Sequence, residues 1–372
     1  MEQQSKRVLS LDVFRGMTVA FMIIVNNQWG TAFAPLRHAA WDGCTPTDLV
    51  FTFFLFIVGV SMWFSYRKQN HELNKATVWR LFKRGALIFL VGFLLNCFPF
   101  WDFAGGVWEN PADLRIMGVL QRIGVAFFIG GVLALWLKTY KRIFIASAVI
   151  LVGYWLLVNL LGDATREGFI GCRIDAFLLG TKHLYKPDQS FDPEGIFSTI
   201  PALATVLLGY ATGKFVGENR TDKWKTLGTL GVAGGLLITA ALIFNRVCPI
   251  NKPIWSPTYV LYTAGLAMQV WMLLLWFYDY KGKTAGKTLW STFGTNALFA
   301  YVLAWVFARI ANMPAFMLTW DGDKVNVMRW MARWFGSWTT PEIGTLLASL
   351  VLVSFVFAVV YPLYRRKIFI RL

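Results

Sequence analysis

The chain has 372 residues, of which 56% are hydrophobic, 17% are aromatic and only 15% are charged, and its mean hydropathy is +0.52. A soluble domain carries about a quarter charged residues, so this composition excludes a disordered chain, a small disulfide-rich domain and an ordinary cytosolic enzyme. The net charge of +16 is typical of a polytopic membrane protein that fixes its orientation with basic residues, and we expect no nucleic-acid partner.

Ten apolar stretches are long enough to cross about 30 Å of hydrocarbon as helices. They predict membrane spans at residues 11–29, 48–66, 85–101, 115–137, 143–161, 197–213, 226–245, 257–278, 289–311 and 342–364. We therefore expect an all-α polytopic membrane protein with about ten transmembrane helices, embedded in a lipid bilayer as one domain over residues 1–372. No cleavable signal peptide is predicted, because the first apolar run carries Asp12 and Arg15 and no small-residue cleavage pattern follows it.

The basic residues are distributed unevenly between the segments that connect these spans. Alternate segments, counted from the N-terminus, hold 22 of the 36 basic residues but only five of the 20 acidic ones. The positive-inside rule places these segments, and with them both termini, in the cytoplasm. The long segments at about 162–196 and 312–341 then lie outside, where they could cap a site. Because no targeting feature is evident, we expect a bacterial inner membrane.

Polar side chains within the first span and the loop after it are the first candidates for a site, since such groups are costly in a membrane. Asp12 and Arg15 lie three residues apart on one helix face, either as a structural ion pair or with Arg15 ready for an anionic ligand. Asn26 lies about three helical turns beyond Arg15. His38 follows in the outer loop, and Asp48 begins the second span.

His38, Asn26 and Asp48 form a chemically sensible group. A neutral imidazole can remove a proton from a nucleophile near neutral pH. A carboxylate can orient that imidazole, and an amide N–H can stabilise an oxyanion. Taken alone, this spacing is weak evidence for a catalytic group, and it favours a structural role.

Later spans carry further polar side chains. We expect Arg115 to reach the outer interface, whereas Arg122 should line a cavity or pair with a carboxylate, because it lies deeper in the fourth span beside Gln121. Asn296 in the ninth span suits either packing or a site.

Several sequence blocks, in order along the chain, resemble the heparan-α-glucosaminide N-acetyltransferase family of membrane enzymes. They are Ser10–Gly16, Val25–Asn27, His38–Gly59, Arg115–Arg122, Phe191–Gly195, Ser198–Pro201, Trp255–Pro257 and Gly294–Asn296. The resemblance implies an acyltransferase that takes acetyl-CoA from the cytoplasmic side and acetylates an amino sugar or glycan on the far side. It assigns the catalytic role to His38, with Asn26 and Asp48 as its partners, and it favours a homodimer.

The matched blocks also suggest which residues contact the substrates. We expect Arg15, Gln121 and Arg122 near coenzyme A. The residues expected at the acceptor are Trp41, Asp42, Glu194 and Asn296, although Asp42 stands where the family usually has Asn. Direct transfer and a transient acetyl-imidazole both remain open.

The cysteines and histidines have no spacing that predicts a metal site. Cys44, Cys97, Cys172 and Cys248 all map to the outer side. They could pair in an oxidising compartment, but we favour free thiols.

An amino-sugar transporter is the alternative function, because it too would place polar groups within the membrane. The absence of an evident internal repeat or of paired broken helices argues against it. A purely structural scaffold explains the buried ionisable residues least well.

Overall fold

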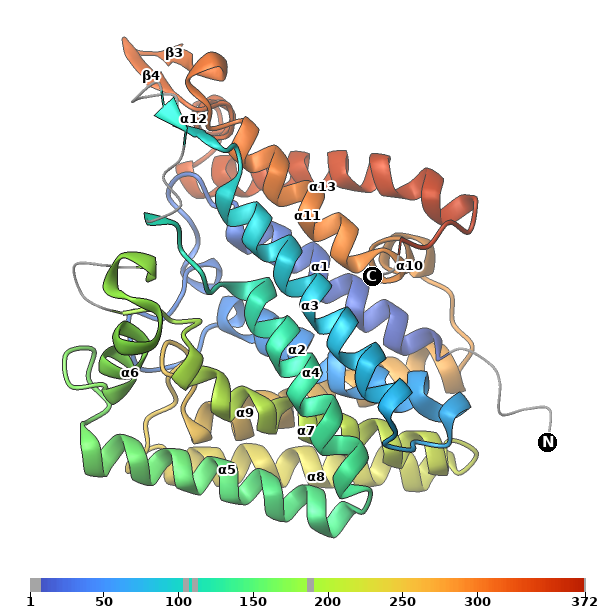
Figure 1. Ribbon diagram of the computed structural model, residues 1–372. Helices are drawn as coiled ribbons and strands as arrows, with labels where there is room; N and C mark the ends of the chain where they lie inside the picture. Colours follow the sequence, from blue (N-terminus) through green and yellow to red (C-terminus); the bar gives the residue numbers. More distant parts are fainter. Residues whose placement is uncertain (1–7, 103–106, 109–112, 186–190, 371–372) are drawn as a thin grey trace.

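The computed structural model describes residues 8–102, 107–108, 113–185 and 191–370. Helices dominate these residues (Figure 1). In chain order they are α1 (Leu9–Asn26), α2 (Pro46–Tyr66), α3 (Lys75–Cys97), α4 (Val119–Leu137), α5 (Tyr140–Leu161), α6 (Ile170–Leu179), α7 (Ile196–Asn219), α8 (Lys223–Phe244), α9 (Pro257–Leu274), α10 (Lys287–Thr295), α11 (Ala297–Ile310), α12 (Val327–Gly336) and α13 (Pro341–Arg365).

Strands are few and short. Trp101–Asp102 (β1) pairs with Val107–Trp108 (β2), and Leu318–Trp320 (β3) pairs with Asp323–Val325 (β4), both in antiparallel fashion. Asp321 and Gly322, which join β3 to β4, both have positive φ, as a tight two-residue hairpin turn requires. The prediction of an all-α polytopic membrane protein is confirmed.

Eight helices in the described part of the chain are long and apolar enough to cross a membrane, and the pair α10–α11 makes a ninth if it is one bent span. The predicted span at 289–311 is therefore wrong as a single helix, because the chain bends by 83° at Asn296. The predicted span at 85–101 corresponds to the second half of α3. That helix starts ten residues earlier, and every 18-residue window of it contains Arg80, Lys83 and Arg84. Because of these three charges, α3 is not among the eight helices that are apolar enough to cross a membrane.

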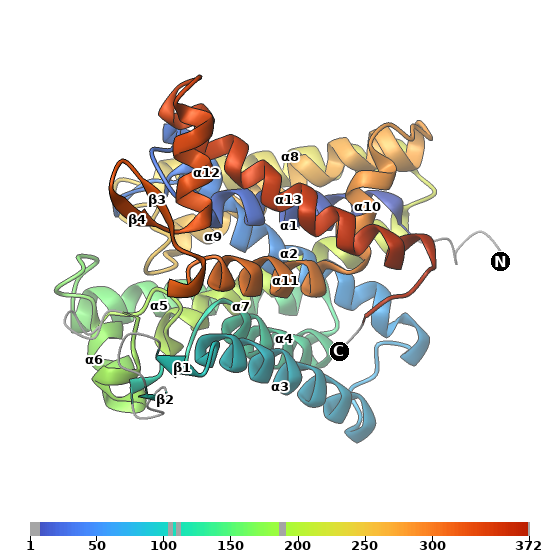
Figure 2. The same cartoon turned by 90° about the horizontal axis from the view of Figure 1, so that it is seen from above.

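The two long segments that were expected outside contain ordered structure. Segment 162–196 holds α6, and segment 312–341 holds the β3–β4 hairpin and α12. The hairpin and α12 lie at the same end of the molecule as the loop between α1 and α2 (Figure 1). Helices α1 and α13 lie side by side, and the start of α1 and the end of α13 are at the opposite end of the molecule (Figures 1 and 2).

Helix α7 forms the centre of the bundle, and α5 and α8 form its periphery. In the most apolar window of α7, 83% of the residues are buried, against 28% in α5 and 22% in α8. Helix α2 packs along α7, α3 along α4 and α8 along α9. The exposed apolar faces of α5 and α8 suit contact with lipid.

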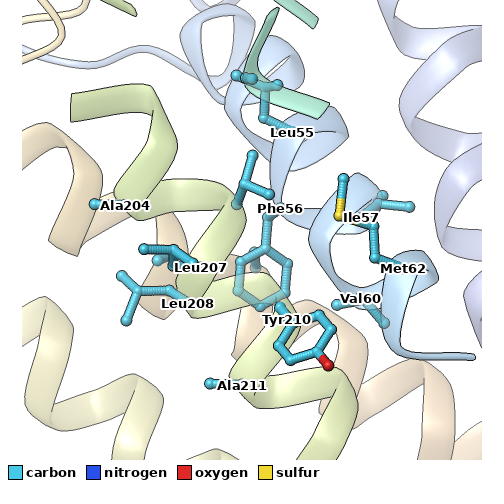
Figure 3. Close-up of a cluster of buried hydrophobic side chains, with 14 of the residues drawn as sticks. Leu55, Phe56, Ile57, Val60, Met62, Ala204, Leu207, Leu208, Tyr210 and Ala211 are labelled. Carbon is cyan, nitrogen blue, oxygen red and sulfur yellow. The ribbon is translucent and has the colours of Figure 1, made fainter. Parts of the chain in front are cut away.

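Helices α2 and α7 pack closely in the core. Phe56 of α2 packs against Leu207 and Leu208 of α7 (Figure 3). Small residues permit this approach: a methyl group at Gly209 would lie only 2.2 Å from the Phe56 carbonyl oxygen. This rigid pair carries the first turn of α2, where the candidate site begins.

Candidate functional site

The candidate site is built around an ion-pair-like contact between His38 and Asp48. The imidazole Nδ1 lies 2.6 Å from the Asp48 Oδ1. The His38 side chain is 52% exposed, whereas that of Asp48 is only 2% exposed. With Nδ1 held by the carboxylate, Nε2 is the ring nitrogen available to a substrate.

Asp48 is positioned by the way α2 begins. Its Oδ2 accepts hydrogen bonds from the backbone N–H groups of Thr45, at 3.0 Å, and Ala39, at 3.1 Å. The bond to Thr45 is half of a capping box, which satisfies backbone donors at the helix N-terminus, and Pro46 suits the first helical position. The residues that start α2 therefore also fix the carboxylate under the imidazole.

His38 and Asp48 open onto a cavity of about 670 Å³ between the ends of several helices. Its polar lining includes Asn26, Asn27, His38, Asp48, Arg115, Arg166, Tyr185, Glu194, Lys252, Tyr301, Arg309 and Asn312. Two tryptophans, Trp29 and Trp305, add apolar surface. The volume is within the range of small-molecule sites in proteins.

The structure brings Asn26 to the same cavity as His38 and Asp48. Asn26 ends α1 and is exposed there, whereas the amide of the neighbouring Asn27 is buried and bonded at both atoms. Asn27 Nδ2 donates to the Ile23 carbonyl at 2.8 Å, and its Oδ1 accepts from Trp29 Nε1 at 3.4 Å. Asn26 is thus the more available amide for a ligand.

Lys252 completes this group, and sequence reasoning missed it. Its Nζ lies 3.2 Å from His38 Nδ1 and 3.4 Å from Asp48 Oδ1. Burial lowers the pKa of the Lys252 ammonium, while the Asp48 and Glu194 carboxylates oppose that shift. The residue lies 214 positions after His38, so no local spacing could have revealed the contact.

Two loops are clamped together to bring Lys252 to the site. The Gly43 N–H donates to the Ile250 carbonyl at 2.6 Å, and Gly43 forms an isolated β-bridge with Asn251. Asn251 Nδ2 also donates to Asp42 Oδ1 at 3.0 Å. Asp42, expected at the acceptor, instead joins the His38 loop to the Lys252 loop.

A second ionic cluster forms another wall of the cavity. Arg115 donates to both Asp192 oxygens, at 2.9 and 2.5 Å, and to Glu194 Oε2 at 2.6 Å. Its guanidinium also lies over the Tyr185 ring at 4.6 Å. Burial opposes the ionised form of Glu194, but the nearby Arg115 and Arg122 guanidiniums lower its pKa overall. Arg115 was expected to reach the outer interface, which stays a prediction; the structure adds its carboxylate partners, Asp192 and Glu194.

The family model for the catalytic region of heparan-alpha-glucosaminide N-acetyltransferase matches residues 7–242, more than half of the chain. This chain belongs to that family. The match confirms the resemblance seen in the sequence and contains His38, Asn26, Asp48, Arg115 and Glu194. Lys252 and Tyr301 lie beyond it.

Two curated heparan-alpha-glucosaminide N-acetyltransferases are similar over nearly the entire chain. The human enzyme is 27% identical and the mouse enzyme 25% identical, each alignment covering 98% of this chain. The alignments cover 59% and 60% of those two proteins. The chain therefore spans about three fifths of the length of the relatives it matches.

Within this family framework, Arg122 and Gln121 lie beside the cavity rather than in it. Arg122 is fully buried and donates to the Pro193 and Gly195 carbonyls and to the hydroxyl groups of Ser198 and Thr199. The prediction that Arg122 lines a cavity or pairs with a carboxylate is therefore wrong, because backbone carbonyls and hydroxyls saturate most of its donors. Gln121 is buried too.

Arg15 and Asn296 lie away from the cavity. Arg15 bonds Ser61 Oγ at 2.6 Å and the Gly294 carbonyl at 3.2 Å, and it pairs with Asp12 at 3.3 Å. Asn296 donates to the Ile368 carbonyl at 3.1 Å and accepts from the Ile370 N–H at 2.8 Å. The structure does not bring Asn296 to His38, because this amide ties the C-terminal segment to the bend between α10 and α11.

Trp41 lies behind the cavity wall. Its Nε1 donates to the Ala164 carbonyl at 2.9 Å, and its ring contacts Phe191 at 5.5 Å between centroids. The Arg166 guanidinium lies over the Trp41 ring at 5.1 Å and lines the cavity. Trp41 thus supports Arg166 and Phe191, which face the space that a substrate would fill.

The described residues contain no cluster of three or more His, Cys, Asp or Glu side chains that could hold a metal ion. No disulfide joins Cys44, Cys172 or Cys248. Burial raises the pKa of the Cys44 thiol to about 12 and that of Cys172 to about 11, so neither is a thiolate at neutral pH.

Proposed function

We propose that this protein is an acetyltransferase that moves an acetyl group from acetyl-CoA to an amine or hydroxyl of an amino sugar or glycan, in the cavity lined by His38. One observation carries the proposal: a half-exposed imidazole, held through Nδ1 by a buried carboxylate, opens onto a cavity of substrate size. Family membership supplies the reaction class.

The arrangement supports a role for each member of the group. His38 Nε2 removes the proton as the acceptor nitrogen or oxygen attacks the thioester carbonyl, and Asp48 stabilises the imidazolium that forms. Asn26 donates its amide N–H to the oxyanion. When the C–S bond breaks, the imidazolium returns its proton to the departing coenzyme A thiolate, so that His38 is neutral again.

We further propose that both termini lie in the cytoplasm and that the His38 cavity faces the opposite side, in a bacterial inner membrane. The excess of basic residues in alternate connecting segments supports this orientation. Acetyl-CoA would come from the cytoplasmic side, where Arg15 is the candidate contact for its phosphates, and the acceptor from the other. A homodimer stays a prediction from the family.

The first test is release of coenzyme A from acetyl-CoA by purified protein in detergent, with a panel of amino sugars. We expect sugar-dependent release that His38→Ala abolishes. His71→Ala is the matched control, because His71 stacks on Trp63 at 3.6 Å near the other end of α2 and should leave turnover unchanged. Undiminished turnover by His38→Ala would contradict the catalytic assignment.

The same protein also decides between an enzyme and a transporter. A transporter would accumulate an amino sugar in vesicles without acetyl-CoA, whereas an enzyme would release coenzyme A. The described residues contain one broken span, α10–α11, and not the pair of broken helices that repeat-built transporters carry. Sugar accumulation without coenzyme A release would overturn the proposed function.

A further inference from the structure

A second groove lies beside the His38 cavity and has no role in the chemistry above. Its volume is about 850 Å³, and it is formed by the loop after α1, the β3–β4 hairpin, α12 and the start of α13. Figure 1 shows the hairpin and α12 together at this end of the molecule. The groove is open, so a ligand bound there would also contact solvent.

Trp29 lines both spaces. The indole is held by its bond to Asn27, which lines the His38 cavity. A second link joins the two walls: Asn326, which caps α12, donates from Nδ2 to Asn312 Oδ1 at 2.7 Å, and Asn312 also lines the cavity. One extended ligand could therefore occupy both spaces, passing Trp29 on the way.

The groove has the chemistry of a carbohydrate site. The indoles of Trp29 and Trp320 offer flat apolar faces, on which the C–H faces of a sugar ring can pack. Two carboxylates, Asp321 and Asp323, and two guanidiniums, Arg329 and Arg333, surround them with donors and acceptors. The formal charge of these four groups sums to zero, which suits a neutral glycan and disfavours a polyanion.

Gln28, which lines the groove, is held by two hydrogen bonds from its amide nitrogen. Gln28 Nε2 donates to the Ile24 carbonyl and to Ser349 Oγ, each at 2.9 Å. Its Oε1 is buried and has no partner among the described residues. Buried polar atoms are nearly always satisfied, so this oxygen is an exception in the wall of the groove.

The aromatic platform is preformed. Trp320 packs edge-on against Trp330 of α12, with 5.9 Å between ring centroids. Arg333 of α12 also lies 3.9 Å from Asp323 of the hairpin, in an exposed ion pair. A platform that is rigid before binding loses less conformational entropy when it binds a sugar.

We propose that this groove binds the neutral oligosaccharide chain of the acceptor, while the sugar that is acetylated sits in the His38 cavity. The inference rests on the proposed function and sharpens it: the acceptor is the end of a glycan chain, and the sugars behind its reactive end pack on Trp29 and Trp320. The groove then determines specificity and takes no part in the chemical step.

The test compares glucosamine with a chitotetraose whose terminal sugar carries a free amine. We expect the wild-type protein to have a kcat/KM about tenfold or more higher for the tetrasaccharide. Trp320→Ala should remove most of that preference and leave kcat/KM for glucosamine unchanged. Arg333→Ala, which removes another side chain that lines the groove, should weaken the preference in the same direction if Trp320→Ala fails to fold.

Trp338→Ala is the matched control, because Trp338 is exposed and packs on Trp334 without lining the groove. It should retain the full preference for the tetrasaccharide. Equal kcat/KM values for the two sugars in the wild type would overturn the proposal. So would an equal loss for both sugars in Trp320→Ala, since that result assigns Trp320 to the whole site.

A binding measurement separates this proposal from the proposed function. Fully acetylated chitotetraose is titrated into His38→Ala, with binding followed by tryptophan fluorescence and calorimetry. We expect binding that Trp320→Ala abolishes. If the tetrasaccharide binds but the wild-type protein acetylates no sugar, the groove proposal is supported and the acetyltransferase proposal fails. If the tetrasaccharide does not bind, the groove proposal fails whatever the turnover.

Discussion

At the scale of single residues, Asp48 is part of two structures at once. It caps the N-terminus of α2 through Thr45 and holds the His38 imidazole. Asp48→Asn should therefore lower turnover by about 10²–10⁴-fold, because an amide does not hold the reactive tautomer. It should also reduce stability by about 0.5–2 kcal/mol through the weakened cap. Coenzyme A release and thermal unfolding in detergent measure the two effects.

Asp222→Asn provides the comparison for Asp48→Asn. Asp222 caps α8 by accepting from the Lys225 N–H at 3.0 Å, far along the chain from the site. Its replacement should affect stability by a similar amount or less and leave turnover intact. Full activity in Asp48→Asn would show that the imidazole needs no carboxylate.

Asp175 predicts how stability depends on pH. Burial raises its pKa to about 6 from an ordinary value of 3.8, against a backbone hydrogen bond from Phe197 that lowers it. The folded state therefore binds this proton more tightly than the unfolded state does. The stabilisation is complete below about pH 4 and is lost as the pH rises through 6, by about 1–3 kcal/mol.

Thermal unfolding between pH 4 and 7 checks this contribution. Asp175→Asn should remove that part of the pH dependence, whereas Glu167→Gln, at an exposed position in the same loop region, should retain it. If the pH dependence of the unfolding midpoint is the same in Asp175→Asn as in the wild type, another group is responsible for it.

At the scale of elements, the contact between α2 and α7 supports the site. A methyl group at Gly209 would lie 2.2 Å from the Phe56 carbonyl oxygen, whereas one at Gly153 of α5 would meet nothing within 4 Å. Gly209→Ala should destabilise the protein by about 1–3 kcal/mol through overpacking. Gly153→Ala should be neutral or stabilising by up to about 1 kcal/mol. The midpoint of thermal unfolding is measured for both variants. Equal midpoints for Gly209→Ala and Gly153→Ala would contradict the close packing of α2 against α7.

The elements also show what the sequence could and could not predict. A long apolar run such as that of α8 must be helical in a membrane, because only a helix satisfies its backbone hydrogen bonds there. The positions of such helices could therefore be predicted from hydropathy. The bend at Asn296 did not, because its polar groups suit a straight helix in a bundle equally well. The hairpin between β3 and β4 had a local signal in Asp321–Gly322 but lay in a segment that was expected to be a loop.

The candidate site shows the same division. His38 and Asp48 are ten residues apart and carry a family pattern, so their pairing could be predicted. Lys252 could not be predicted, because a clamp between distant loops brings it to Asp48. Arg122 was misjudged because a buried guanidinium can be satisfied by carbonyl groups, which leave no sequence signature.

At the scale of the whole molecule, the distribution of basic residues predicts the membrane orientation. In a background with all four cysteines replaced by serine, Asp321→Cys on the hairpin should react with a membrane-impermeant maleimide added to intact cells. Lys283→Cys, in the turn before α10, should react only after permeabilisation, since the positive-inside rule places it in the cytoplasm. The reverse pattern would invert the orientation.

The clamp between residues 42–43 and 250–251 has a consequence for biosynthesis. The family match ends at residue 242, yet Asp42 and Gly43 find their partners only when the chain has been made beyond that point. A ribosome that has inserted α1 to α8 has therefore produced the imidazole and its carboxylate without the lysine beside them. We therefore expect the nascent protein to lack the complete His38–Asp48–Lys252 group until residues 250–252 have been made. Two separately expressed parts, divided between α8 and residue 250, should complete the group only when they associate.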